Sequence, residues 1–161
     1  MRVAEELRYL ILAIQREGNR LLASELRPLG VTPSQAEVLR VLGDHGPLTL
    51  TALGELLVCE TGNSPSRLVD RLVAQDLVRR DIDPEDRRYV TLSLTTDGEG
   101  LSRRICAVEE LLYSTIDELV ADHDVDETLG TLRALAAAFP AGRAVARRRD
   151  AAGTQQRART T

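Results

Sequence analysis

The stretch "LVRRDIDPEDRRYVTLSLTTDGEG", residues 77–100, decides the fold of this chain. Its first six residues and Tyr89–Leu94 have the composition of two strands, and the second alternates apolar and polar side chains. An acidic loop with one proline separates them, and a threonine pair after the second strand offers the cap of a helix. The sequence therefore predicts a β-hairpin. A hairpin that only closes a sheet has no need of adjacent arginines beside its tip, where this one carries Arg87 and Arg88.

The residues before the hairpin have the pattern of a helix-turn-helix. Thr49 caps a short helix expected at 50–57, residues 59–65 read as a turn, and Pro65 suits the first turn of the next helix. The second helix of such a motif fits the major groove of DNA. A hairpin directly after it reaches the minor groove or backbone nearby, where arginine is favoured. This order of elements makes a DNA contact the best explanation of the arginine pair.

A structural explanation of the same residues has to be weighed beside this one. Helix-turn-helix spacing is common in all-α proteins, and Arg87 and Arg88 could neutralise Asp83, Glu85 and Asp86 on a solvated loop. The two elements in the right order favour the DNA-binding interpretation.

The charge of the chain is distributed unevenly. The net charge is −4, all 21 basic residues are arginines, and residues 141–161 carry +5 against −9 for residues 1–140. Residues 60–95 hold six arginines and seven acids. A DNA-binding surface must therefore be a local arginine patch on an acidic body, and we expect its affinity to depend steeply on salt.

Other classes of protein find little support in the sequence. The chain has two cysteines, no signal-peptide pattern and no apolar run near the ~20 residues that span a membrane, so we expect a cytoplasmic protein with no membrane partner. There is no Ser–His–acid spacing, no phosphate-binding glycine loop and no paired metal ligands. We therefore predict no enzyme, no cofactor and no metal site, and the acidic run 122–127 reads as a helix break and helix start.

The stretch "LVDRLVAQDLVRRDIDPEDRRYVTLSLTTDG", residues 68–98, resembles the signature region of the MarR family of winged-helix transcriptional regulators. The family pattern has L-x-D-x-L at the end of the recognition helix, then a G-L-V-x-R strand, D-x-R in the wing and L-T-x-x-G at the next helix. The corresponding residues here are Leu68–Leu72, Leu77–Arg80, Asp86–Arg88 and Leu94–Gly98. Asp76 replaces the usual glycine before the Leu-Val pair, so that turn must tolerate a side chain.

The resemblance implies roles for individual residues. Arg88 in the wing would enter the minor groove with Asp86 orienting its guanidinium, and Arg67 is the best candidate for a base edge because arginine to guanine is the commonest specific contact. The predicted DNA-binding residues are Asn63, Ser64, Ser66, Arg67, Arg71, Asp86, Arg87 and Arg88.

The helices on either side carry more apolar residues than a small winged domain needs, and an uncovered apolar stripe favours an interface. The resemblance implies a two-fold homodimer through the first and last helices, which binds a pseudo-palindromic operator as a repressor and is released by a small-molecule effector. Nothing identifies that effector. Residues that could line its pocket are Tyr9, Arg16, Arg20, His45 and Tyr113, although exposed helix faces explain the arginines equally well.

The predicted fold class is mainly α with a small β-hairpin, a winged helix-turn-helix domain flanked by dimerisation helices. The predicted division is an N-terminal dimerisation helix at 1–30, the winged helix-turn-helix at 31–95, C-terminal dimerisation helices at 96–140 and an Arg-rich tail at 141–161 that we expect to be mobile.

Two alternative functions stay open. One is a winged-helix protein–protein module without DNA binding, and the other is a thiol-based redox sensor acting through Cys59, for which a semi-buried filler is the simpler reading.

Overall fold

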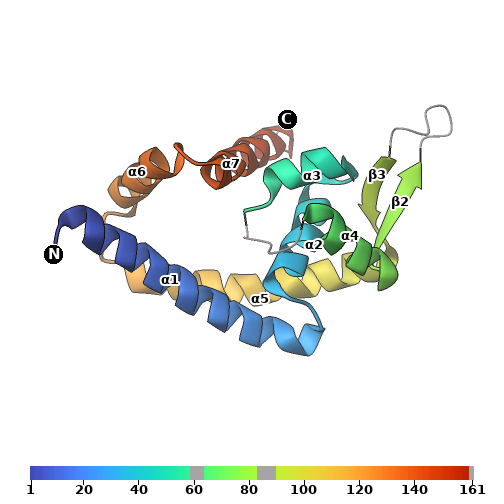
Figure 1. Cartoon of the computed structure of the whole chain (residues 1–161), viewed down its shortest axis with the longest axis horizontal. Coiled ribbons are helices and arrows are strands. Elements are labelled where there is room, and N and C mark those ends of the chain that lie inside the picture. Colours follow the sequence, from blue (N-terminus) through green and yellow to red (C-terminus); the bar gives the residue numbers. More distant parts are fainter. Residues whose placement is uncertain (59–63, 83–89, 160–161) are drawn as a thin grey trace.

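The structure is a computed structural model that describes residues 1–58, 64–82 and 90–159, with side chains as far as residue 153. It is mainly helical with one small sheet, which confirms the predicted fold class (Figure 1). Its elements are α1 (Val3–Leu26), the 3-10 turn η1 (Arg27–Leu29), α2 (Pro33–His45), β1 (Leu48–Thr49), α3 (Leu50–Leu56), α4 (Pro65–Ala74), β2 (Val78–Ile82), β3 (Val90–Leu94), α5 (Thr96–Val120), α6 (Val125–Ala136) and α7 (Pro140–Arg159).

The helix starts form where the sequence offers a capping side chain. At α2 the Gln35 amide donates to Thr32 Oγ1 at 3.3 Å, and the Thr32 amide donates to Gln35 Oε1 at 3.0 Å, so the two residues form a capping box. Thr49 caps α3 by accepting from the Ala52 amide at 3.2 Å. These caps satisfy amides that a helix start leaves without intrahelical partners, and so they fix where each helix begins.

The sheet consists of three antiparallel strands in the order β1-β3-β2. The predicted hairpin is confirmed by β2 and β3, whose register pairs Val78 with Leu94 and Ile82 with Val90. The third strand, β1, pairs Leu48 with Leu92 and is only two residues long. Two residues cannot show an alternating pattern, so this strand was not predicted.

The core lies where α2 meets α3, α4, the sheet and the first half of α5. It is entirely aliphatic, as the scarcity of aromatic residues requires. Its largest fully buried side chains are Leu26, Leu39, Leu53, Leu72, Leu92, Ile105, Val38, Val69 and Val78. The recognition helix and the hairpin thus share one hydrophobic core with α2, which fixes their relative positions.

The C-terminal residues differ from the sequence expectation. We predicted a tail at 141–161, whereas Pro140–Arg159 form the helix α7, which packs against α3 and α6. This segment is rich in Ala and Arg and has almost no apolar stripe, so periodicity gave no signal. Both residue types have high intrinsic helix propensity, and contacts with α3 add to it.

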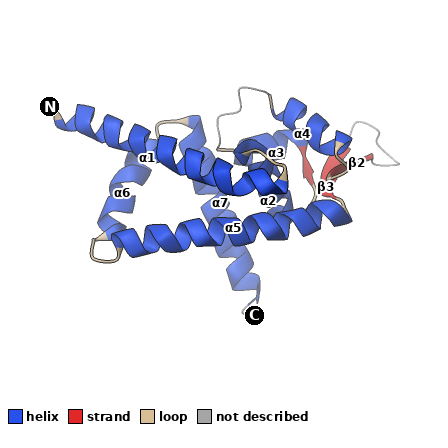
Figure 2. Cartoon of the chain, turned by 90° about the horizontal axis from the view of Figure 1, so that it is seen from below, coloured by secondary structure: helices blue, strands red, loops and turns tan. Residues whose placement is uncertain are grey.

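The two longest helices, α1 and α5, extend from the winged part of the molecule to the opposite end, where α6 lies (Figures 1 and 2). A groove of about 640 Å³ between α1 and α6 is lined mainly by apolar side chains. Among the helices that the structure describes, none is both long and apolar enough to cross a bilayer.

Candidate nucleic-acid interface

The helix α4 is divided into a buried and an exposed side. Leu68, Val69 and Leu72 are buried against the core, whereas Arg67 and Arg71 are exposed and lie one helical turn apart. This arrangement follows from the i, i+4 spacing of the two arginines, which places both on one face. The helix presents two guanidinium groups to solvent in the position of a recognition helix.

The start of α4 carries two hydroxyl groups. Ser64 is the N-cap residue and its side chain makes no capping bond, while its Oγ lies 3.0 Å from Ser66 Oγ. Helix N-termini with donors of this kind bind phosphate groups readily. Both serines are among the predicted DNA-binding residues, and the structure places them beside Arg67 at the same end of α4.

An ion pair joins the recognition helix to the hairpin. Arg80 Nη2 on β2 lies 2.5 Å from Asp70 Oδ1 on α4, and both side chains are largely exposed. Exposed pairs contribute less than about 1 kcal/mol to stability. The ion pair matters instead for the charge of the surface. Asp70 lies between Arg67 and Arg71 in sequence, and Arg80 of the neighbouring strand neutralises its negative charge.

A second polar cluster lies on the other face of the hairpin. Arg79 Nε donates to Ser93 Oγ at 2.9 Å and to Asp81 Oδ2 at 3.2 Å, and the Ser93 hydroxyl donates to the same oxygen at 2.5 Å. The hydrogen bond from Ser93, together with the hydrogen bond and positive charge of Arg79, holds the pKa of Asp81 below its ordinary value. Asp70 and Asp81, two of the seven acids in residues 60–95, are therefore paired with arginines of β2.

The base of the hairpin is fixed by the junction of α4, β2 and α5. Asp76 has a left-handed φ of 57°, the Leu77 amide donates to the Leu72 carbonyl and the Asp76 amide donates to the Val73 carbonyl. This is a Schellman ending, in which glycine is usual. The Thr95 hydroxyl donates to the Asp76 carbonyl at 2.7 Å, so the turn does accommodate a side chain and is tied to the start of α5.

The remaining predicted DNA-binding residues cannot be placed. Asn63, Asp86, Arg87 and Arg88 lie outside the described residues, as does Cys59. Their roles stay predictions. The residues that sequence reasoning missed are Asp70, Arg79 and Arg80, since their importance depends on which residue faces which across β2, β3 and α4.

The five predicted pocket residues occupy different places in a single chain. Arg16 and Arg20 on α1 line a cavity of about 610 Å³ together with residues of α2, and His45 lines another of about 350 Å³. Tyr9 and Tyr113 are about half exposed on α1 and α5. The structure groups the two arginines but does not bring all five residues to one cavity within the chain.

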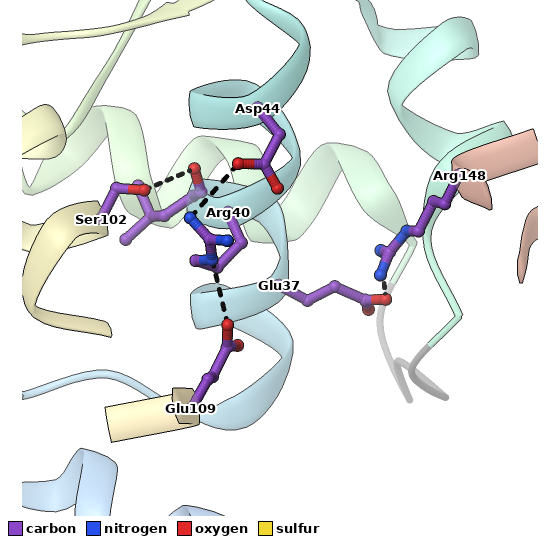
Figure 3. A network of polar contacts seen from close by, with 7 residues as sticks. Glu37, Arg40, Asp44, Ser102, Glu109 and Arg148 are labelled. Atoms are coloured by element: carbon purple, nitrogen blue, oxygen red, sulfur yellow. Dashed lines mark hydrogen bonds and ion pairs between the residues drawn. The ribbon is translucent and has the colours of Figure 1, made fainter. Parts of the chain in front are cut away.

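A network between α2 and α5 lies beneath the interface (Figure 3). Arg40 Nε donates to Glu109 Oε2 at 3.0 Å, and Arg40 Nη1 is 3.3 Å from Asp44 Oδ1. Burial raises the pKa of Glu109 despite this ion pair. Burial alone would lower the pKa of Arg40, but acidic neighbours led by Asp44 raise it overall. Burial also raises the pKa of the nearby Tyr113, with Glu109 adding to the effect.

Metal chemistry has no candidate among the residues that the structure describes, where no three His, Cys, Asp or Glu side chains gather. Cys106 lies half buried on α5 and lines a cavity of about 500 Å³ beside Arg40. A lone thiol in this position is consistent with a packing role.

Comparison with known proteins gives a consistent result. The model of the MarR family matches residues 31–90. The multiple antibiotic resistance protein MarR of Salmonella typhimurium is 33% identical over 92 residues. These residues are 57% of this chain, which thus spans 63% of the length of that protein. The organic hydroperoxide resistance transcriptional regulator of Bacillus subtilis is 32% identical over 104 residues, which are 65% of this chain and 70% of that protein.

A solved structure shows the same fold in contact with DNA. The crystal structure of a MarR variant from E. coli complexed with operator DNA has a TM-score of 0.66 and 27% sequence identity, and covers 87% of this chain and 100% of that chain. The named relatives are regulators, which agrees with the prediction that the chain is not an enzyme.

Proposed function

We propose that this chain, which belongs to the MarR family, is a cytoplasmic transcriptional regulator that binds double-stranded DNA as a homodimer. In each subunit, α4 enters the major groove, and the hairpin of β2 and β3 contacts the flanking minor groove or backbone. The solved complex of a related protein with operator DNA supports this assignment. In this proposal residues 31–95 form the DNA-binding region, as the sequence predicts.

One observation carries the proposal. Arg67 and Arg71 project from one face of α4 and pair with no acid among the described residues, while Asp70 is engaged by Arg80 on the hairpin. The exposed face of α4 is thus locally cationic although the whole chain is acidic. A pair of exposed guanidinium groups beside the hydroxyls of Ser64 and Ser66 suits both phosphate and base contacts.

The apolar surfaces on α1, α5 and α6 support the homodimer. Many of their aliphatic side chains are exposed in the single chain, among them Ile14 on α1 and Leu119 on α5, each 73% exposed. A continuous apolar surface of this kind marks an interface. We propose a two-fold dimer that places its two recognition helices on successive turns of a pseudo-palindromic operator.

We also propose that the protein acts as a repressor whose release depends on a small-molecule effector. The support is the family relationship together with the cavities beside α1 and α2. The wing contact through Arg88, with Asp86 as its orienting partner, belongs to the same proposal.

The test is a fluorescence anisotropy titration of DNA from upstream of the gene with the protein and with Arg67→Ala. We expect Arg67→Ala to weaken specific binding by about tenfold to 100-fold, because a bidentate contact to a base contributes ~1–3 kcal/mol. Arg133→Ala is the matched control, since it removes an equally exposed arginine from α6 and should leave affinity unchanged.

The outcomes separate the candidate functions. Equal losses of DNA affinity in Arg67→Ala and Arg133→Ala would mean that Arg67 contributes only through its charge and makes no specific contact with a base. No binding by the unmodified protein even at low salt would favour the protein–protein module instead.

A further inference from the structure

The C-terminal helix α7 makes a specific contact with the helix-turn-helix that the family relationship does not explain. Glu37 of α2 is a carboxylate whose side chain is only 8% exposed. Its Oε1 accepts a hydrogen bond from the Val58 amide at 2.8 Å and lies 2.5 Å from Arg148 Nη2 of α7. A buried carboxylate is stable only with such donors, so three segments far apart in sequence meet at one oxygen. Figure 3 shows the contact between Glu37 and Arg148.

The same arginine also holds the end of α3. Arg148 Nε donates to the Leu56 carbonyl at 2.7 Å, and Leu56 is the last residue of α3. Carbonyls at a helix C-terminus lack intrahelical donors and carry partial negative charge, so a guanidinium satisfies both needs. Only the fork geometry of arginine reaches Glu37 and Leu56 together.

The contact acts on the turn that leads into the recognition helix. Leu56 ends α3 and Val58 follows it, in the connection to α4, which starts at Pro65. The neighbouring Arg147 adds an exposed ion pair with Glu55 at 3.1 Å, on the same side of α3. The positions of Leu56 and Val58 relative to α2 are therefore fixed from two sides, by Glu37 and by α7.

We propose that Arg148 is a positioning residue for DNA recognition, which braces the turn between α3 and α4 through Glu37 and Leu56. The inference rests on the proposed function and deepens it, because it gives the C-terminal helix a part in setting the affinity of α4 for DNA. Arg148 acts through the turn and does not touch the duplex.

The experiment compares Arg148→Ala with Arg149→Ala in the full-length protein. Arg149 is the adjacent arginine of α7, and its recorded partner is Asp150 at 3.8 Å. We expect Arg148→Ala to weaken DNA binding by about tenfold, in the range by which residues in a coupled network change affinity at a distance. Arg149→Ala should bind as the unmodified protein does.

The salt dependence distinguishes positioning from a direct contact. Loss of a phosphate contact lowers the slope of log affinity against log salt by about one, whereas loss of a brace leaves it unchanged. We expect an unchanged slope for Arg148→Ala. Arg148→Lys should recover part of the affinity, because an ammonium group reaches Glu37 without bridging to Leu56.

A second measurement does not need DNA. Hydrogen exchange of the Val58 amide, followed by NMR, should be faster in Arg148→Ala and unchanged in Arg149→Ala, because Val58 and Arg148 share the Glu37 oxygen. Unchanged DNA affinity, a reduced salt slope or unchanged Val58 exchange in Arg148→Ala would each overturn the proposal. If the unmodified protein binds no DNA, the proposed function fails, and the Val58 exchange still decides whether the brace exists.

Discussion

Asp76 shows how a single residue adapts the family pattern. It takes the left-handed conformation that usually requires glycine, at the junction between the recognition helix and the wing. Aspartate tolerates this conformation better than most residues because its short polar side chain can bond locally. The turn keeps its geometry because the Thr95 hydroxyl donates a hydrogen bond to the Asp76 carbonyl.

Gly98, in the first turn of α5, has no such freedom. A Cβ atom there would lie 2.0 Å from the Leu77 carbonyl oxygen, so the backbones of α5 and of the hairpin base would have to separate. We expect Gly98→Ala to lower the free energy of unfolding by about 2–3 kcal/mol, as overpacking does when backbone must move. Urea unfolding followed by circular dichroism measures this loss.

Gly54→Ala is the matched control. A Cβ atom at Gly54 would meet Pro65 Cγ at 3.7 Å, an ordinary contact, so alanine should stabilise α3 by up to about 1 kcal/mol. Equal destabilisation by both substitutions would contradict the geometric argument.

At the scale of elements, the pairing of α4 with β2 and of α2 with α5 decides how the interface is presented. The ion pair of Asp70 and Arg80 leaves the outer face of α4 cationic. On the inner side, Arg40 and Glu109 join α2 to α5 in a half-buried environment. The two pairs differ in their solvent exposure, since the pair of Asp70 and Arg80 is largely exposed and that of Arg40 and Glu109 is largely buried.

The raised pKa of Glu109 predicts a pH dependence of stability. Its folded-state pKa lies above the ordinary value of 4.5, so the folded protein holds this proton more tightly than the unfolded chain. The contribution to stability is fully present below about pH 4.5 and is lost as pH rises through the folded-state pKa. Burial is the cause, and it outweighs the Arg40 contact.

Urea unfolding of the unmodified protein and of Glu109→Gln across pH 4 to 8 tests this sign, because glutamine does not titrate. We expect the unfolding free energy of the unmodified protein minus that of Glu109→Gln to fall as pH rises. Glu110→Gln supplies the baseline for removing one charge from the exposed side of α5. A difference that rises with pH would reverse the assignment.

For the whole molecule, the uncovered apolar surface of α1, α5 and α6 is the dominant feature. The groove between α1 and α6 is lined mainly by aliphatic residues and Phe139. It lies at the end of the molecule away from α4 and the hairpin. Aliphatic side chains exposed on this scale favour an interface. In the dimer that we propose, a second copy would bury them, and the long helices would set the distance between the two DNA-binding regions.

We expect Ile14→Glu to convert the proposed dimer to a monomer. A charge placed in the apolar interface is desolvated twice, once in each subunit, and should weaken dimerisation by at least about 100-fold, or ~2.7 kcal/mol. Analytical ultracentrifugation measures the change. Ile82→Glu alters a similarly exposed residue on β2 and should leave the dimer intact, and an unchanged dimer in Ile14→Glu would move the interface elsewhere.

Much of the fold was predictable because its signals are local. These signals are the Thr49 cap, the helix-opening Pro65 and the alternation of Tyr89–Leu94, each of which involves residues only a few positions apart. Helical periodicity likewise identifies the buried side of each helix without knowledge of its partner. The exposed face of α4, with Arg67 and Arg71, followed directly from this periodicity.

The remaining features depend on pairings across the chain. Strand β1 exists because β3 offers a free edge, and α7 is held by contacts with α3 that lie about 90 positions earlier in sequence, as in the bond from Arg148 to Leu56. Arg79, Arg80 and Asp70 gained their roles only once the register of the hairpin was known. The sequence by itself determined the elements and their order, because local hydrogen bonding and side-chain periodicity act over a few residues. The tertiary structure alone decided which charges neutralise each other and which remain exposed for DNA, because electrostatic pairing depends on distance in space.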